Sequence, residues 1–160
     1  MAEKILVPLD GSGLGEAALE YVNSFISRLS PTEHVTVILL HIITTLTHQL
    51  DVHSGGVGTV IIPFTPEEIE KMEKESVEYL KKAGKKISGC GAIIETHIVI
   101  GNNPAEEIVK AETDFGCDLV AMSTHGRSGL SRWAFGSVTD KVLRAGKVPV
   151  LMVRAEKHKS

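Results

Sequence analysis

The sequence predicts an α/β protein that is doubly wound, with a parallel β-sheet and helices on both of its faces. Short apolar runs alternate with longer amphipathic segments from residue 4 to residue 153. Continuous apolar runs are typical of parallel strands that are covered on both faces. Strands that alternate with helical crossovers require helices on both sides of one sheet. The 160 residues, of which 42% are hydrophobic, fit one domain with a full core.

The first part of the chain contains two predicted strands with one helix between them. The strands are Lys4–Leu9 and Val35–Ile43, which are almost entirely apolar. Between them, Gly13–Leu29 carries apolar residues at the spacing of one helical face. The segment Thr44–Phe64 breaks the pattern with three glycines and a proline. We therefore predict a loop there, with a short extended piece at Val57–Ile62.

The remainder of the chain contains three more strands and three more helices. Thr65-Pro66-Glu67-Glu68 begins the first of these helices with an N-cap, a proline and a capping-box glutamate, and the helix is expected to end near Ser88. Asn103 is expected to cap the second helix, which ends at Gly116. The third helix is Ser137–Ala145. The predicted strands are Ile93–Ile100, Asp118–Met122 and Val148–Val153.

The end of the fourth strand carries the clearest functional signal. Ser123 is followed by a loop with Gly126, Arg127 and Gly129, and Gly136-Ser137 then begins a helix. Glycines let the backbone approach a ligand closely, and the N–H groups and dipole of a helix start favour negative charge. An arginine in such a loop can pair with phosphate oxygens. The segment therefore indicates a phosphate-binding site, although a long connection without a ligand is the alternative.

Asp10 follows the first strand, in the segment Leu9-Asp10-Gly11-Ser12. In open parallel sheets, ligands bind beyond the carboxyl ends of strands, where the winding direction switches. If the first and fourth strands are the central neighbours, Asp10 and the Gly126 loop face one crevice. The alternative is that Asp10 only stabilises the turn that follows it.

Three separated segments resemble the universal stress protein family. Val7-Pro8-Leu9-Asp10-Gly11-Ser12 ends the first strand, Gly126 precedes Gly136-Ser137 by nine intervening residues, and Val148-Pro149-Val150-Leu151-Met152-Val153 forms the last strand. The resemblance covers the whole chain and implies a five-stranded parallel sheet of order 3-2-1-4-5. It implies one nucleotide-binding domain at residues 1–154, followed by a polar tail at 155–160. It also implies a homodimer and, in one branch of the family, ATP binding.

The resemblance also implies a role for each matching residue. Asp10 would hydrogen-bond the ribose hydroxyls, Pro8 and Ile42 would line the adenine pocket, and Met122 would lie near the adenine or the ribose. Any divalent ion, Mg²⁺ or Mn²⁺, would come with the ATP phosphates. The residues that would surround those phosphates, mostly through backbone N–H groups, are Gly126, Gly129, Gly136, Ser137 and Val138.

Ser123 stands where the family's ATP-binding signature has its first glycine. Its backbone can still approach a phosphate or a ribose if its φ is negative, whereas a positive φ costs serine more than glycine. The sequence therefore predicts a cytoplasmic, ATP-binding universal stress protein that acts as a nucleotide-dependent switch or sensor. A nucleotide-free dimeric interaction module is the alternative. An adenylate-releasing hydrolase of related fold would need an SGGxDS segment, which the chain lacks.

The sequence predicts no catalytic residue and no metal site built by the protein. His125 has no evident nucleophile and carboxylate around it, so we expect it to orient the loop or to face water. His41, His48, Asp51 and His53 have a spacing that permits a metal site, but their segment lacks a defined scaffold. Without a positioned base, a Walker-type lysine or an acidic pair, ATP hydrolysis is expected to be slow or absent.

Charge and hydropathy bear on the partners and the cell compartment. A net charge of −3 argues against nucleic acid and anionic membranes as partners, and the apolar runs are too short to span a bilayer. Cys90 and Cys117 have no CxxC spacing, which favours reduced thiols in a cytoplasmic protein. The strand Val148–Val153 would leave an apolar sheet edge, so we expect a homodimer through it.

Overall fold

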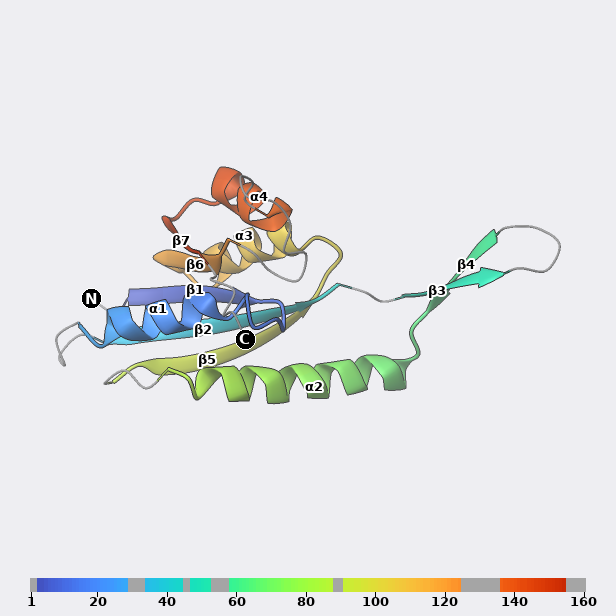
Figure 1. The fold of residues 1–160 in the computed structure, drawn as a ribbon, viewed down its shortest axis with the longest axis horizontal. Helices are drawn as coiled ribbons and strands as arrows, with labels where there is room; N and C mark the ends of the chain where they lie inside the picture. The colour runs from blue at the N-terminus through green and yellow to red at the C-terminus, as the bar shows by residue number, and fades with distance from the viewer. Residues whose placement is uncertain are drawn as a thin grey trace, which may run out of the picture.

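A computed structural model describes residues 3–28, 34–44, 47–52, 58–87, 91–124 and 136–154. Its centre is a five-stranded parallel sheet in the order β5-β2-β1-β6-β7 (Figure 1). β3 and β4 belong to a separate sheet, so β5, β6 and β7 are the third, fourth and fifth strands of this one. The predicted order 3-2-1-4-5 is therefore confirmed. The strands are β1 (Glu3–Leu9), β2 (Val35–Ile43), β5 (Ile93–Ile100), β6 (Leu119–Ser123) and β7 (Val150–Val153).

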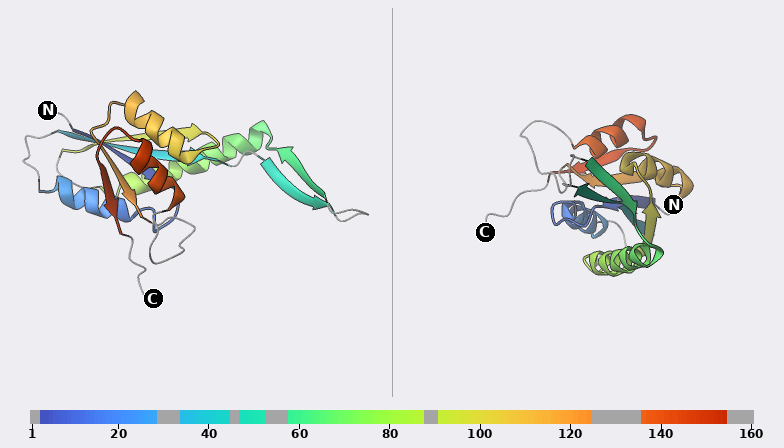
Figure 2. Two further views of the ribbon diagram at one scale, coloured as in Figure 1. Left: turned by 90° about the horizontal axis from the view of Figure 1, so that it is seen from above. Right: turned by 90° about the vertical axis from the view of Figure 1, so that its right-hand side faces the viewer.

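The helices of the described chain cover both faces of this sheet. In Figure 2, α1 and α2 lie on one side of the strands and α3 and α4 on the other. This arrangement confirms the predicted doubly wound α/β class. No helix among the described residues is long and apolar enough to cross a membrane. The helices are α1 (Ala17–Ile26), α2 (Pro66–Gly84), α3 (Pro104–Asp114) and α4 (Ser137–Ala145).

The alternation of side chains along the central strands builds two cores. Ile5, Val7 and Leu9 of β1 pack in the cluster that includes α1 and α2, whereas Leu6 packs in the cluster that includes α3 and α4. All four side chains are at most 4% exposed. Each such burial contributes on the order of 1.5–3 kcal/mol. The central strands are almost entirely apolar because both of their faces are buried.

The segment Thr44–Phe64 is not the loop that we predicted. Within it, β3 (Thr47–Val52) and β4 (Gly58–Pro63) form a separate two-stranded antiparallel sheet. This ribbon extends away from the main sheet (Figure 1). Our prediction gave more weight to the glycines and the proline than to the β-branched residues Val60, Ile61 and Ile62, which favour a strand. The extended piece predicted at Val57–Ile62 overlaps β4.

Several predicted boundaries shift by a few residues. α1 begins at Ala17 and not at Gly13, because residues 11–16 form a turn. α2 ends at Gly84, before the predicted Ser88, and β7 begins at Val150. α4 begins at Ser137 as predicted.

Two predicted helix starts are confirmed in position, and one of them in detail. At α2, the Glu68 N–H donates to Thr65 Oγ1 at 3.3 Å and the Thr65 N–H donates to Glu68 Oε2 at 2.8 Å, which is a complete capping box. At α3, Asn103 is the N-cap residue, but its side chain accepts no cap hydrogen bond. Its Nδ2 donates to Glu106 Oε1 at 2.5 Å instead.

We expect Thr65→Ala to lower the free energy of unfolding by about 1 kcal/mol, because the first turn of α2 loses its cap. Urea denaturation measures the change. The control is Glu73→Ala, which alters an exposed position of the same helix and should shift stability by less than about 0.5 kcal/mol. Equal losses for the two variants would show that the capping box does not contribute.

Candidate functional site

A cavity of about 660 Å³ lies beyond the carboxyl ends of β1, β2 and β6. It is lined by the residues after β1, by the end of β2, by the end of β6 and by the N-terminus of α4. Chain segments that are distant in sequence therefore converge, as the sequence predicted. The predicted site residues that line this cavity are Pro8, Asp10, Ile42, Met122, Ser123, Gly136, Ser137 and Val138. Gly126, Arg127 and Gly129 lie outside the described residues, as does His125.

Asp10 is held by the turn that connects β1 to α1. Its Oδ1 accepts hydrogen bonds from the Ser12 N–H at 2.9 Å and from Ser12 Oγ at 2.6 Å. Ser12 Oγ accepts in turn from the Gly15 N–H at 2.9 Å. Gly11 has φ 82°, a left-handed conformation that favours glycine. Asp10 therefore does stabilise a turn, as the alternative interpretation expected, and it also borders the cavity.

Gly15 lets the Asp10 carboxylate approach the start of α1. A Cβ atom at Gly15 would collide with Asp10 Oδ1. Because glycine has no Cβ, the carboxylate packs directly against the backbone there. This close contact explains why a glycine is present at position 15.

Ser123 connects the end of β6 to the start of α1. Its hydroxyl donates to the Gly15 carbonyl at 2.9 Å and accepts from the Ala18 N–H at 3.2 Å. The first N–H groups of a helix have no acceptor within the helix. Glu16, the N-cap residue of α1, makes no side-chain cap hydrogen bond. Ser123, at the end of β6, supplies the cap instead. Because Ser123 lies in the extended backbone of β6, the position needs no positive φ.

The N-terminus of α4 faces the same cavity. Gly136 is the N-cap residue and Ser137 is the first residue of the helix. The helix start is tied to β6, because Thr139 Oγ1 donates to the Ser123 carbonyl at 3.4 Å. The first N–H groups of α4 and the positive end of its dipole form a site that suits an anion.

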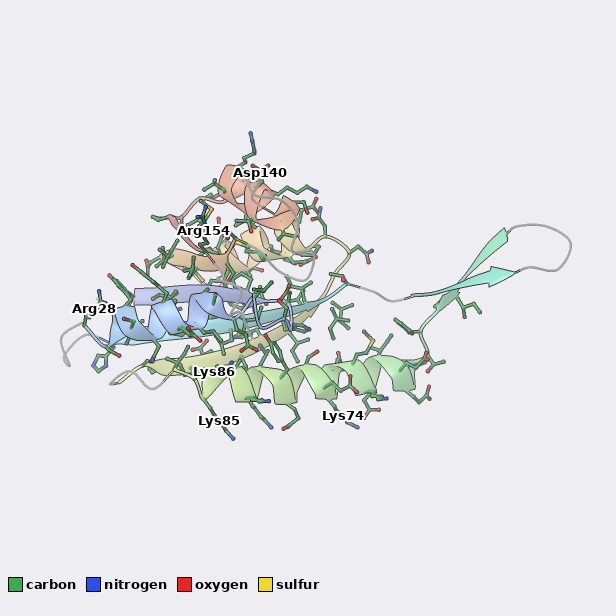
Figure 3. The ribbon with its side chains drawn as sticks, in the orientation of Figure 1. Arg28, Lys74, Lys85, Lys86, Asp140 and Arg154 are labelled. Atoms are coloured by element: carbon green, nitrogen blue, oxygen red, sulfur yellow. The ribbon has the colours of Figure 1, made fainter. Side chains whose placement is uncertain are left out.

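The inner face of α2 forms a wall of the cavity that the sequence analysis missed. Met72, Glu75, Ser76 and Tyr79 line the cavity from this helix. Their spacing over two turns is the helical signal that identifies one face. Lys74, on the other side of α2, and Lys85, the C-cap residue of this helix, point away from the sheet (Figure 3).

His41 is positioned by the neighbouring strand. Its Nδ1 lies 2.8 Å from the Leu9 carbonyl, and its ring meets the Tyr79 ring edge to face, with centroids 5.5 Å apart. Among the residues that the structure describes, no group of three or more His, Cys, Asp or Glu side chains is placed to hold a metal ion. The side chains of His48, Asp51 and His53, which the sequence grouped with His41, are not among those described.

Cys117 lies at the start of β6, and it does not line the cavity. It is 6% exposed, which confirms that the thiol is buried. Burial raises the pKa of this thiol to about 11, so it stays protonated at neutral pH.

We expect Ser123→Ala to lower the free energy of unfolding by about 1–2 kcal/mol, because it removes the donor to Gly15 and the cap on α1. Hydrogen exchange should accelerate at the Ala18 amide. Ser24→Ala, at an exposed position of α1, is the control and should leave both quantities unchanged. An unaltered Ala18 exchange rate in Ser123→Ala would contradict this cap.

Comparisons with known proteins agree with this geometry. The sequence model of the universal stress protein family matches residues 1–154. Universal stress protein MJ0577 of Methanocaldococcus jannaschii is 34% identical over 160 residues, which cover 96% of each chain. Universal stress protein YxiE of Bacillus subtilis is 30% identical, over 96% of this chain and 100% of its own. The solved structure of MJ0577 superposes with a TM-score of 0.71 at 29% identity, covering 98% of each chain.

Two more distant structures share the fold and contain adenine nucleotides. One is the universal stress protein of Archaeoglobus fulgidus in complex with dAMP, with a TM-score of 0.58, 18% identity and 94% and 96% of the two chains covered. The other is a family protein of Arabidopsis thaliana with AMP bound, with a TM-score of 0.63, 17% identity and 98% and 94% covered. On the match along residues 1–154 and the identity to MJ0577, the chain belongs to the universal stress protein family, as its three sequence segments predicted.

Proposed function

We propose that this protein binds ATP in the cavity beyond β1, β2 and β6 and acts as a nucleotide-dependent switch or sensor. The observation that carries the proposal is the convergence of Asp10 and the N-terminus of α4 on one cavity. An acidic acceptor and a cationic helix start are the two groups that a sugar and a phosphate require. Adenine nucleotides in the family proteins of Archaeoglobus fulgidus and Arabidopsis thaliana support this class of ligand.

The dimensions and lining of the cavity fit a nucleotide. Its volume of about 660 Å³ lies within the range of roughly 300–1,000 Å³ that is usual for small-molecule sites. Pro8, Ile42 and Met122 supply apolar surface for a base. Asp10 supplies an acceptor for the sugar. The apolar residues therefore suit the base and Asp10 suits the sugar, which are the roles that the family resemblance implies for them.

The phosphates would lie at the start of α4, against Gly136, Ser137 and Val138. We assign Gly126, Arg127 and Gly129 to the same anionic group because they follow Ser123 in the sequence. Mg²⁺ or Mn²⁺ would enter with the phosphates. Turnover of ATP is proposed to be slow or absent, and phosphate release from purified protein measures it directly.

A homodimer through Val148–Val153 is a further part of the proposal. β7 is an edge strand of the sheet, so one side of its backbone is unpaired within the described chain. α1 packs next to it and carries the exposed side chains of Tyr21 and Phe25, which are 50% and 37% accessible. A two-fold pairing of β7 would cover the edge and this apolar surface together.

The alternative is an interaction module that works as the same dimer without a nucleotide. The use of the Ser123 hydroxyl inside the protein, on Gly15 and Ala18, favours it, because the side chain at this signature position then has a structural role. The two functions differ in one measurable property, which is the affinity for ATP.

We expect calorimetric titration with ATP and Mg²⁺ to show binding, and Asp10→Ala to weaken it by about tenfold or more, equivalent to about 1.4 kcal/mol. The carboxylate is lost in this variant together with its turn contacts. Ser12→Ala is the matched control, because it removes the Ser12 Oγ hydrogen bond to Asp10 and keeps both the Ser12 N–H bond and the carboxylate, so its effect on affinity should be smaller. No detectable heat with millimolar ATP would favour the nucleotide-free module.

We expect light scattering to give twice the monomer mass, and Met152→Pro to shift the species towards the monomer. The Pro149 and Val153 carbonyls accept hydrogen bonds from the N–H groups of Val120 and Thr124, so Val150 and Met152 direct their backbone groups outward. Proline at Met152 removes one outward N–H and leaves the bonds to β6 in place. A monomer mass for the unaltered protein would contradict the dimer.

A further inference from the structure

The Tyr79 hydroxyl is a buried polar group that makes no well-formed hydrogen bond with the described part of the chain. Tyr79 extends from α2 into the lining of the cavity. Its oxygen is inaccessible to solvent and makes no hydrogen bond of normal geometry with the described residues. The carboxylates of Glu16 and Asp10 and the backbone of Gly11 lie around it. Buried hydroxyls usually have a partner, so this one calls for an explanation.

The hydroxyl keeps its proton and is therefore a donor. Burial raises the pKa of Tyr79 above its ordinary value, and the charge and proximity of the Glu16 carboxylate and the charge of Asp10 raise it further. A protonated phenol has one O–H to donate. The Glu16 carboxylate lies near this donor but makes no hydrogen bond of normal geometry with it, so an acceptor on a ligand in the cavity would satisfy it.

The neighbouring carboxylates are already engaged elsewhere. Glu16 forms an ion pair with Lys86, which lies on the segment after α2 (Figure 3). Asp10 Oδ1 accepts two hydrogen bonds from Ser12. Both carboxylates therefore have partners other than Tyr79, although each keeps lone pairs that can accept further hydrogen bonds.

The ring of Tyr79 is held in place by packing. His41 meets it edge to face at 64°, and the Leu9 carbonyl holds His41 by its Nδ1. The ring also packs against the core cluster between α2 and the sheet. A side chain fixed in this way positions its hydroxyl next to Asp10 before any ligand arrives, which lowers the entropy cost of binding.

We propose that Tyr79 donates a hydrogen bond to a sugar hydroxyl oxygen of the bound nucleotide, beside Asp10, which accepts from the same sugar. The inference rests on the proposed function and deepens it. Each sugar hydroxyl has both a proton to donate and lone pairs that accept, so a neighbouring donor and acceptor are complementary to a ribose. A site built in this way selects ribonucleotides over nucleotides whose sugar lacks the hydroxyls.

The test is a cycle of four affinities, measured by calorimetry with Mg²⁺. The unaltered protein and Tyr79→Phe are each titrated with ATP and with 2′,3′-dideoxy-ATP. Tyr79→Phe should weaken ATP binding by about three- to tenfold, the range of a single hydrogen bond. Its affinity for dideoxy-ATP should change by less than about twofold, since the acceptor is absent there. Tyr21→Phe, at an exposed tyrosine of α1, is the control and should bind both nucleotides as the unaltered protein does.

The possible results are distinct. If Tyr79→Phe weakens both nucleotides equally, or neither, the hydroxyl does not contact the sugar and the inference is overturned. A fall in melting temperature without ligand, together with unchanged ATP affinity, would overturn it in favour of a contact between Tyr79 and Glu16. If the unaltered protein binds ATP, the proposed function stands whatever Tyr79→Phe shows. If it binds neither nucleotide, the proposed function and this inference fall together.

Discussion

The parallel pairing of β1 with β6 is the constraint on which the site depends. Ile5 pairs with Leu119 and Leu6 with Val120, so the carboxyl ends of both strands reach the same edge of the sheet. β2 and β5 lie on one side of this pair and β7 on the other. After β1 the chain enters α1 on one face, and after β6 it continues to α4 on the other face. The two departing segments separate, and the cavity lies between them.

Contacts of Ser123 and Gly15 fix the position of Asp10 relative to β6 and α1. The Ser123 hydroxyl binds the Gly15 carbonyl and caps α1, while the Asp10 carboxylate packs against the same glycine. The position of the acid therefore depends on β6, although more than 100 residues separate the two in the chain. A serine in place of the signature glycine adds a contact to the scaffold. Its extended backbone imposes none of the strain that a left-handed position would impose.

Periodicity and helix-start chemistry were enough to predict the main sheet, because they depend on local residues. Ile5, Leu6 and Val7 are apolar in succession, which identifies a strand buried on both faces. The convergence of Asp10 with the α4 start followed from the rule for parallel sheets. The antiparallel ribbon was missed because its glycines resemble those of a loop. Tyr79 was missed because helical spacing does not distinguish a face on the core from a face on a cavity.

Charge determines how a nucleotide would lie in this cavity. Asp10 and Glu75 line the end near α1 and α2, whereas the α4 start presents backbone N–H groups and the positive end of a helix dipole. Phosphates placed near the carboxylates would meet like charge, and the repulsion is stronger in a partly buried site than in water. The phosphates of a bound nucleotide would therefore be confined to α4. With the phosphates there, the sugar is the part of the nucleotide that lies nearest to the acids, and its hydroxyls can donate to a carboxylate where a phosphate cannot.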